Sequence, residues 1–354
     1  VFLQRLGIGA CLADDMGLGK TIQFIALMLH ERREGMTTGP TLLFAPTSVV
    51  GNWQRELARF GPSLKAMVHH GIDRLHGDAF VQAAAAHDIV ITSYALAHRD
   101  IEDLRRPAWY RVVLDEAQKI KNPYAAATMA IRSIPATQHV ALTGTPIENH
   151  LPELWSIMEA LNPGLLGSAS EFRERFVVPI EKLADRDRAL QLRGLIRPFV
   201  LRRTKSDPQV AADLPEKMEM RVYCNLTAEQ AAIYQGITSS MLEQVEGAEG
   251  IRSRGLILAG LTRLKQVCDH PELVDGLSPG AATAGRVPAL DGRSGKCERL
   301  VEMLEEVLEE GDRALVFTQF RQMGHVLERL LAERLRVPLL FLHGGTPRRG
   351  DATV

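Results

Sequence analysis

The chain has 354 residues, of which 45% are hydrophobic and 24% are charged, and its formal net charge is −1. This composition is typical of a globular chain with two or three domains, and it excludes a protein that binds nucleic acid through its overall charge. The four cysteines form no CxxC pair, which argues against a zinc site or a disulfide framework and favours a cytoplasmic location. No apolar run reaches about 18 residues, so we expect no membrane span.

Five short apolar runs alternate with helical patterns in the first part of the chain. They are continuous and rich in β-branched residues, as buried parallel strands are. Each run ends directly in polar or small residues. Because the carboxyl ends of parallel strands line the ligand crevice of an α/β sheet, the pattern predicts a nucleotide-binding edge. The expected strands are Ala10–Ala13, Thr41–Ala45, Ile89–Thr92, Val112–Leu114 and Val140–Thr143.

The later part of the chain is first helical and then returns to α/β alternation. Helical patterns run from Leu151 to about Arg197 and again over Asn225–Leu273, and the Gly- and Pro-containing segment Ser278–Gly295 predicts a loop. A helical stripe with an i, i+3, i+4, i+7 spacing begins at Leu300. After it we expect strands at Ala314–Phe317 and Pro338–Leu342 around a helix at Met323–Leu335, and we also consider an earlier strand at Met218–Cys224.

The segment after the first strand has the pattern of a phosphate-binding loop. Gly17 and Gly19 allow a tight turn that presents N–H groups to phosphate oxygens. Lys20 can reach the β- and γ-phosphates, and the Thr21 hydroxyl can ligate Mg²⁺. Asp14 stands where the common pattern G-x-x-x-x-G-K-[ST] has its first glycine, and an ordinary strand-to-helix turn remains an alternative. The candidate ATP-binding residues are Asp14, Asp15, Met16, Gly17, Leu18, Gly19, Lys20 and Thr21.

A second polar segment follows the expected strand Val112–Leu114. After a phosphate loop, Asp115 is suited to hold Mg²⁺ and Glu116 is suited to orient or deprotonate the attacking water. The adjacent glutamate favours ATP hydrolysis, although a strand that enters a solvated acidic turn is the simpler alternative. The candidate catalytic residues are Lys20, Asp115, Glu116 and Gln118, with Thr21 and Asp115 as the candidate Mg²⁺ ligands.

A third strand end carries Thr143, Gly144 and Thr145. The two hydroxyls can hydrogen-bond the acidic pair or its water, and can thereby couple the loss of the γ-phosphate to a movement of the chain. A plain turn before Pro146 is the alternative.

Together these segments resemble, in order, the motifs of Swi/Snf-type ATPases, which are helicase-like motors of superfamily two. The matching segments are DDMGLGKT (14–21), DEAQ (115–118), LTGTPIEN (142–149), LRRTK (201–205) and LKQVCDHP (264–271). The resemblance covers essentially the whole chain, and DEAQ in place of DEAH is similar to the bacterial and archaeal branch. It implies a translocase that uses ATP and Mg²⁺ to move on double-stranded DNA, and strand separation does not follow from these motifs. It also implies DNA-bound proteins as further partners and a nucleoid-associated location.

The resemblance implies an α/β fold with a RecA-like P-loop ATPase lobe, helical insertions and an incomplete second RecA-like lobe. We expect residues 1–210 to form the ATP-binding lobe, with a helical insertion at about 151–197, and residues 211–354 to form a helical insertion and the incomplete second lobe. The family's Gln motif is expected before Val1. Its last two motifs, with the arginine fingers, are expected after Val354, so we expect the isolated chain to be inactive.

The family resemblance also implies that both lobes contact the DNA backbone from their strand ends. Each candidate contact is equally explained as a capping or turn residue, and Trp53 also by packing of the helix that it begins. The basic residues Arg197, Arg202, Arg203 and Lys205 either touch DNA or form a solvated or salt-bridged face. The candidate DNA contacts are Thr47, Ser48, Trp53, Ser93, Tyr94, Thr318 and Gln319.

Two other functions remain open at the level of the sequence. The chain is alternatively a passive module that binds nucleotide and DNA without turnover, or another P-loop phosphotransferase such as a kinase, which would need an acceptor pocket and a lid. The pair His69 and His70 has no acidic or cysteine partner at metal-binding spacing, so we expect it to be structural. The sequence leaves the oligomeric state open.

Overall fold

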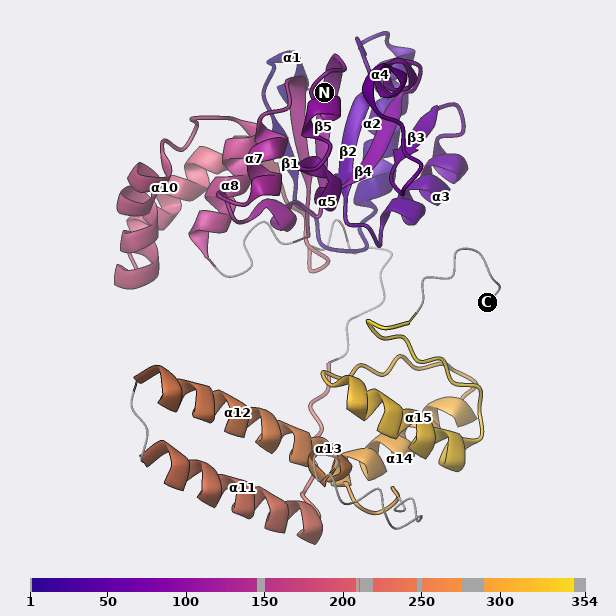
Figure 1. Cartoon of the computed structure of the whole chain (residues 1–354), viewed down its shortest axis with the longest axis vertical. Coiled ribbons are helices and arrows are strands. Elements are labelled where there is room, and N and C mark those ends of the chain that lie inside the picture. Colours follow the sequence, from indigo (N-terminus) through magenta and orange to yellow (C-terminus); the bar gives the residue numbers. More distant parts are fainter. Residues whose placement is uncertain are drawn as a thin grey trace. The chain divides into compact units, whose positions relative to one another are not determined.

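The computed structural model describes residues 2–144, 150–207, 210, 219–246, 250–275 and 290–346. By its internal contacts the chain divides into two compact units, Val1–Lys217 (unit 1) and Met218–Val354 (unit 2). Figure 1 labels helices and strands of both units where there is room.

Unit 1 is built on a seven-stranded sheet with the order β3-β4-β2-β5-β6-β1-β7, in which every pairing is parallel. The strands β2, β4 and β5 are buried along their whole length, which explains their continuous apolar runs. This sheet confirms the expected α/β fold. The strands are β1 (Ala10–Leu12), β2 (Thr41–Ala45), β3 (Ala66–His69), β4 (Ile89–Ser93), β5 (Trp109–Asp115), β6 (Ala136–Leu142) and β7 (Val200–Leu201).

Helices cover both faces of this sheet, as Figure 1 shows. Alternate residues of β2 enter different cores: Leu43 packs with Ile25 and Trp53, whereas Leu42 and Phe44 belong to the core on the other face. The first core contains α2 (Lys20–Arg33) and α3 (Val50–Phe60), and the second contains α4 (Gly77–Ala85), α7 (Ala126–Arg132) and α8 (Leu151–Leu161). The shorter helices are α1 (Phe2–Arg5), α5 (Tyr94–Ala97), α6 (Ile101–Leu104) and a 3₁₀ helix (Ala117–Ile120).

The expected helical segment leaves the sheet at α8 and returns to it at β7. It contains α9 (Ala169–Phe172), a π-helix (Arg173–Lys182), α10 (Arg186–Ile196) and a 3₁₀ turn (Arg197–Phe199). The two residues of β7 then pair with Cys11 and Leu12 of β1. This edge strand was not expected, and it brings the segment Leu201–Lys205 beside the loop that follows β1.

Unit 2 consists of helices in the part that the structure describes. Its core joins α13 (Glu272–Asp275), α14 (Gly295–Glu309) and α15 (Arg321–Leu335), with Val301 and Leu327 among the buried residues. The other two helices, α11 (Ala228–Glu246) and α12 (Gly250–Asp269), contact each other extensively. No described helix of the chain is long and apolar enough to cross a membrane.

The structure contradicts the strands that the sequence predicts in unit 2. Residues 314–317, 338–342 and 219–224 lie in no strand, and Met218 is outside the described residues. The side chains of Leu315, Phe317, Leu340 and Leu342 are between 83% and 88% exposed. An apolar run becomes a strand only when a neighbouring strand satisfies its backbone groups, and these two runs do not pair with each other.

Candidate functional site

Three of the expected functional segments meet at the carboxyl edge of the sheet in unit 1. Asp115 is level with Leu142 of β6, and Leu142 is level with Leu12 of β1. The residues that directly follow these three strands are therefore neighbours in space. They are the loop after β1, Glu116 after β5 and Thr143 after β6. The short segment after β7 joins the same edge, because Leu201 is level with Leu12.

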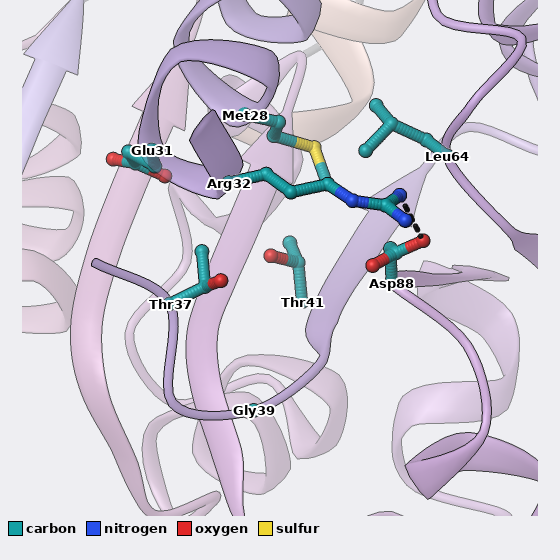
Figure 2. A pocket seen from close by; sticks show the side chains of 8 residues that line it. All are labelled: Met28, Glu31, Arg32, Thr37, Gly39, Thr41, Leu64 and Asp88. Atoms are coloured by element: carbon teal, nitrogen blue, oxygen red, sulfur yellow. Dashed lines mark hydrogen bonds and ion pairs between the residues drawn. The ribbon is translucent and has the colours of Figure 1, made fainter. Parts of the chain in front are cut away.

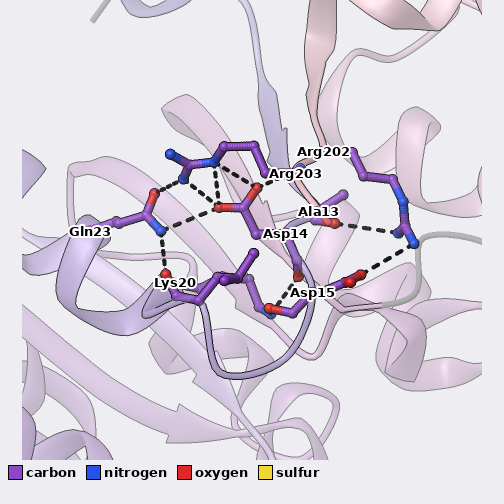
Figure 3. Close-up of polar contacts among 8 residues, drawn as sticks. Ala13, Asp14, Asp15, Lys20, Gln23, Arg202 and Arg203 are labelled. Carbon is purple, nitrogen blue, oxygen red and sulfur yellow. Dashed lines mark hydrogen bonds and ion pairs between the residues drawn. The ribbon is translucent and has the colours of Figure 1, made fainter. Parts of the chain in front are cut away.

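The loop after β1 has the geometry of a phosphate-binding loop. Gly17 and Gly19 have φ angles of 87° and 76°, which residues with a side chain rarely adopt. Helix α2 begins directly after them, so its N-terminal end faces the loop. The Lys20 ammonium donates to the backbone carbonyl oxygens of Asp14 (2.7 Å) and Asp15 (3.4 Å), as Figure 3 shows. Thr21 is half-buried in the first turn of α2, where its hydroxyl can serve as an oxygen ligand.

Asp14, which replaces the usual glycine, has a fully buried side chain. Its Oδ1 accepts hydrogen bonds from the backbone N–H of Arg203 (2.9 Å) and from Arg203 Nε (3.2 Å), and its Oδ2 accepts one from Gln23 Nε2 (3.3 Å). Burial acts to raise the pKa of Asp14, but the hydrogen bonds and the charge of Arg203 outweigh it and hold the pKa below its usual value. The carboxylate is therefore charged and paired beneath the loop.

Asp115 is held by two donors at the end of β5. Its Oδ2 accepts a 2.7 Å hydrogen bond from the indole N–H of Trp53, and its Oδ1 accepts one of 3.0 Å from the backbone N–H of Glu116. Burial raises the pKa of this carboxyl, assisted by the charge of Glu116 and opposed by Trp53 and Lys20. A carboxylate held in this way is a hard oxygen ligand of the kind that Mg²⁺ prefers.

The acidic pair is connected to the third strand end by a chain of hydrogen bonds. Gln118 Nε2 donates to Glu116 Oε2 over 2.7 Å, and the Thr143 hydroxyl donates to Gln118 Oε1 over 2.9 Å. Glu116 has a φ of 50°, a conformation that is uncommon for a residue with a side chain and is found at functional sites. Gly144 follows Thr143, and a Cβ there would lie 2.9 Å from Met16 Cγ. Thr145 is outside the described residues.

The structure corrects part of the expected DNA surface. Trp53 and Ser93 are buried, so their side chains are not available to DNA. The half-buried Tyr94 donates its hydroxyl to the backbone carbonyl of Asp115 over 2.7 Å. Ser48, by contrast, is exposed and Thr47 is half-buried after β2. Thr318 and Gln319 are exposed in unit 2.

Sequence reasoning missed the contribution of the segment after β7. Arg203 binds Asp14, and Arg202 lies near Asp15, with 3.4 Å between Nη2 and Oδ1 (Figure 3). Asp14 and Asp15 have a charge opposite to that of Arg202 and Arg203. This opposite charge is the one indication in the sequence that the two segments contact each other. Without knowledge of β7, their distance along the chain conceals the pairing.

Two pockets of unit 1 lie away from this site. Figure 2 shows one at the amino-terminal edge of the sheet, where Arg32 bridges to Asp88 over 3.0 Å beside Thr41 and Leu64. A second pocket adjoins Ala136 at the start of β6. No group of three or more His, Cys, Asp or Glu side chains that could hold a metal ion is found among the described residues.

A parallel sheet with a phosphate loop after β1, an acidic pair after β5 and a threonine after β6 defines a RecA-like P-loop domain. The model of the SNF2-related domain family matches residues 3–273, and the chain belongs to this family.

Three relatives place the chain within this family. It is 45% identical over 354 residues to the putative ATP-dependent helicase/translocase YwqA of Bacillus subtilis, covering 100% of this chain and 38% of the relative. It is 33% identical to the ISWI chromatin-remodeling complex ATPase ISW2 of Saccharomyces cerevisiae, covering 93% of this chain and 29% of the relative. The solved SWI2/SNF2 ATPase core of Sulfolobus solfataricus in complex with dsDNA is 41% identical with a TM-score of 0.57, covering 98% of this chain and 70% of that one. The chain thus spans less than half the length of the Bacillus subtilis and Saccharomyces cerevisiae relatives.

Proposed function

We propose that the chain is the ATP-hydrolysing part of a translocase that moves on double-stranded DNA. The observation that carries the proposal is the hydrogen-bonded chain from Glu116 through Gln118 to Thr143, beside a loop that contains Lys20. A carboxylate at the attacking water and a cation at the phosphates are two of the groups that ATP hydrolysis requires. In this proposal unit 1 is the ATP-binding lobe, and unit 2 is a helical insertion with an incomplete second lobe.

Each group has a separate task in the reaction. Lys20 leaves the carbonyl oxygens that it now contacts and binds the terminal phosphates of ATP. Glu116 orients a water molecule and takes its proton while the water oxygen attacks the γ-phosphorus, and the bond to the β-phosphate breaks to release ADP. Thr21 and Asp115 would hold Mg²⁺, which neutralises charge on the phosphates. The Gln118 amide keeps Glu116 in place and connects it to Thr143, which would couple hydrolysis to a movement of the chain.

The relatives support the choice of DNA as the partner. One solved neighbour is a complex with dsDNA, and another relative is named for chromatin remodelling. We propose that Thr47, Ser48, Thr318 and Gln319 contribute contacts to phosphates, that DNA-bound proteins are the further targets, and that the protein acts at the nucleoid in the cytoplasm. Contacts to phosphates predict an affinity that falls with salt.

The test compares ATP hydrolysis with duplex DNA, single-stranded DNA, RNA and no polymer, in the 354-residue chain and in the protein at its full natural length. We expect stimulation by duplex DNA above that by the other polymers in the full-length protein. Stimulation by RNA alone would contradict the choice of partner. Tight binding of ATP and DNA without stimulated turnover in either form would instead establish the passive module.

A further inference from the structure

We propose that Arg203 is a positioning residue for the phosphate loop, which it holds through the buried carboxylate of Asp14. The inference rests on the proposed function, because it concerns the same nucleotide site. It also explains why this loop has an aspartate where the common pattern has a glycine: the carboxylate is the anchor by which a distant strand holds the loop.

The first observation is the way in which Arg203 surrounds this carboxylate. The guanidinium Nε lies 3.2 Å from Oδ1 and 3.1 Å from Oδ2, Nη2 contacts Oδ2, and the backbone N–H of Arg203 lies 2.9 Å from Oδ1. Asp14 has no exposed side-chain surface, whereas 38% of the Arg203 side chain is exposed. A buried carboxylate needs such a partner, because an isolated charge is strongly destabilised when water is removed.

The second observation is that Gln23 extends the network across the loop. Its Nε2 donates to the carbonyl oxygen of Leu18 (2.8 Å) and to Asp14 Oδ2 (3.3 Å), and its Oε1 accepts from Arg203 Nη2. Asp14 lies at the start of the loop, Leu18 near its end and Gln23 in the first turn of α2. One network therefore fixes both ends of the loop, and none of its bonds uses the N–H groups of Gly17 and Gly19, which phosphate needs.

The third observation is that backbone bonds continue past the end of β7. The N–H of Ala13 donates to the carbonyl of Leu201 (2.7 Å), and the N–H of Asp15 donates to the carbonyl of Arg203 (3.0 Å). The N–H of Lys205 then donates to Asp15 Oδ2 (3.0 Å). Residues 201–205 thus run along the first half of the loop, and the guanidinium of Arg203 binds it at the centre of this contact (Figure 3).

The neighbouring Arg202 provides a matched control. It has the same side chain and lies beside the same loop, but its contacts to Asp15 Oδ1, to the Ala13 carbonyl and to the Gly144 carbonyl are 3.4, 3.4 and 3.3 Å long. Its side chain is 44% exposed, and that of Asp15 is 31% exposed. Solvent weakens such a pair, so the loss of Arg202 is expected to matter little.

The experiment compares Arg203→Gln, Arg202→Gln, Asp14→Asn and the double variant Asp14→Asn/Arg203→Gln in the 354-residue chain. The first readout is the Kd for a fluorescent ATP analogue with Mg²⁺. The second is the hydrogen-exchange rate of the peptide 13–21, which needs no nucleotide. Arg203→Gln should raise the Kd about tenfold or more and accelerate exchange, because the Asp14 charge loses its partner, and Arg202→Gln should change the Kd less than about twofold. The double variant should have a Kd and an exchange rate close to those of Arg203→Gln alone, because both changes break the same contact.

Three results would overturn the proposal. The first is that Arg203→Gln leaves the Kd and the exchange rate unchanged. The second is that Arg202→Gln has an equal effect, and the third is that the effects of Arg203→Gln and Asp14→Asn add up in the double variant. If Arg203→Gln fails to fold, the comparison of Asp14→Asn with the double variant decides: an equal Kd supports an action through the Asp14 charge, and a higher Kd in the double variant contradicts it. If the unmodified chain binds no nucleotide, the proposed function fails, and exchange of the loop still tests the role of Arg203.

Discussion

The indole N–H of Trp53 donates a 2.7 Å hydrogen bond to Oδ2 of Asp115, so α3 holds the acidic end of β5. Trp53 is fully buried, and its ring meets that of Phe24 at an interplanar angle of 78° with centroids 6.2 Å apart. The only polar atom of the tryptophan side chain is thus used to orient a carboxylate. Trp53, which the sequence suggests as a DNA contact, instead orients Asp115, the expected Mg²⁺ ligand.

Replacement of Trp53 by phenylalanine should therefore weaken the binding of Mg²⁺ rather than the binding of DNA. We expect a loss of about 1–2 kcal/mol in the free energy of unfolding, from the hydrogen bond and the smaller ring. We expect the Mg²⁺ concentration for half-maximal ATP hydrolysis by the full-length protein to rise about tenfold, because partners of metal ligands tune affinity. Trp109→Phe is the control, since its indole donates to the Leu104 carbonyl instead. An equal Mg²⁺ dependence in both variants would contradict the assignment.

Lys20→Ala should abolish turnover in the full-length protein and weaken ATP binding by about tenfold or more, because the loop loses the ammonium that reaches the terminal phosphates. Titration of Mg·ATP, followed by fluorescence of a labelled analogue, measures the change. Lys119→Ala, at an exposed position, should bind as the unmodified chain does. Unchanged hydrolysis by Lys20→Ala would show that the site lies elsewhere.

Glu116→Gln keeps the shape of the side chain but removes the carboxylate that accepts the proton from water. We expect ATP binding to be retained and kcat in the full-length protein to fall by ~10²–10⁴. Single-turnover hydrolysis separates the two effects, with Glu102→Gln on the exposed side of α6 as the control. If binding is lost while the rate of chemistry survives, Glu116 has a structural role.

The stability of unit 1 should depend on pH through His69. This ring is fully buried beside Phe80, and its Nε2 lies 2.9 Å from Asp100 Oδ2. Burial lowers its pKa more than Asp100 raises it, so below pH ~6.5 the unfolded chain takes up a proton that the folded chain resists. The free energy of unfolding should then fall as the pH is lowered from about 7 to 5, by at most ~1.4 kcal/mol per pH unit.

Asp100 shifts stability in a different range. The hydrogen bonds from Arg74, and next that from His69, keep its pKa below the usual value against the effect of burial. Its contribution is present above pH ~3.8 and is lost only as the pH falls through the lower folded-state pKa. The pH range from 7 to 5 therefore leaves out Asp100, and a variant of His69 is needed to separate it from His139, whose pKa burial also lowers.

Urea unfolding followed by tryptophan fluorescence measures this effect in unit 1 alone, because all three tryptophans of the chain lie there. His69→Gln keeps a donor for Asp100 but does not titrate, so its stability should change less between pH 7 and 5. The exposed His70→Gln should behave as the unmodified chain does. Equal slopes for all three proteins would contradict the prediction.

Local patterns were enough to predict the central part of the sheet and the position of the candidate site residues at its edge. The strands β1, β2, β4, β5 and β6 lie where continuous apolar runs indicated them, because a strand buried on both faces needs such a run. The phosphate loop and the acidic pair follow those runs directly along the chain. Parallel pairing then brings their carboxyl ends together, so the meeting of Lys20, Glu116 and Thr143 was predictable from sequence.

Partners that are distant along the chain were decided only by the tertiary structure. The edge strands β3 and β7 have four and two residues, too few for a periodic pattern, and β7 forms because β1 offers a free edge. The apolar runs at 314–317 and 338–342 match the strand pattern equally well, yet they form no strand, because backbone groups pair only with a neighbour in place. The roles of Arg203 and Trp53 also depend on distant neighbours. The sequence shows only a cation and an indole, and the fold places Arg203 beside Asp14 and Trp53 beside Asp115.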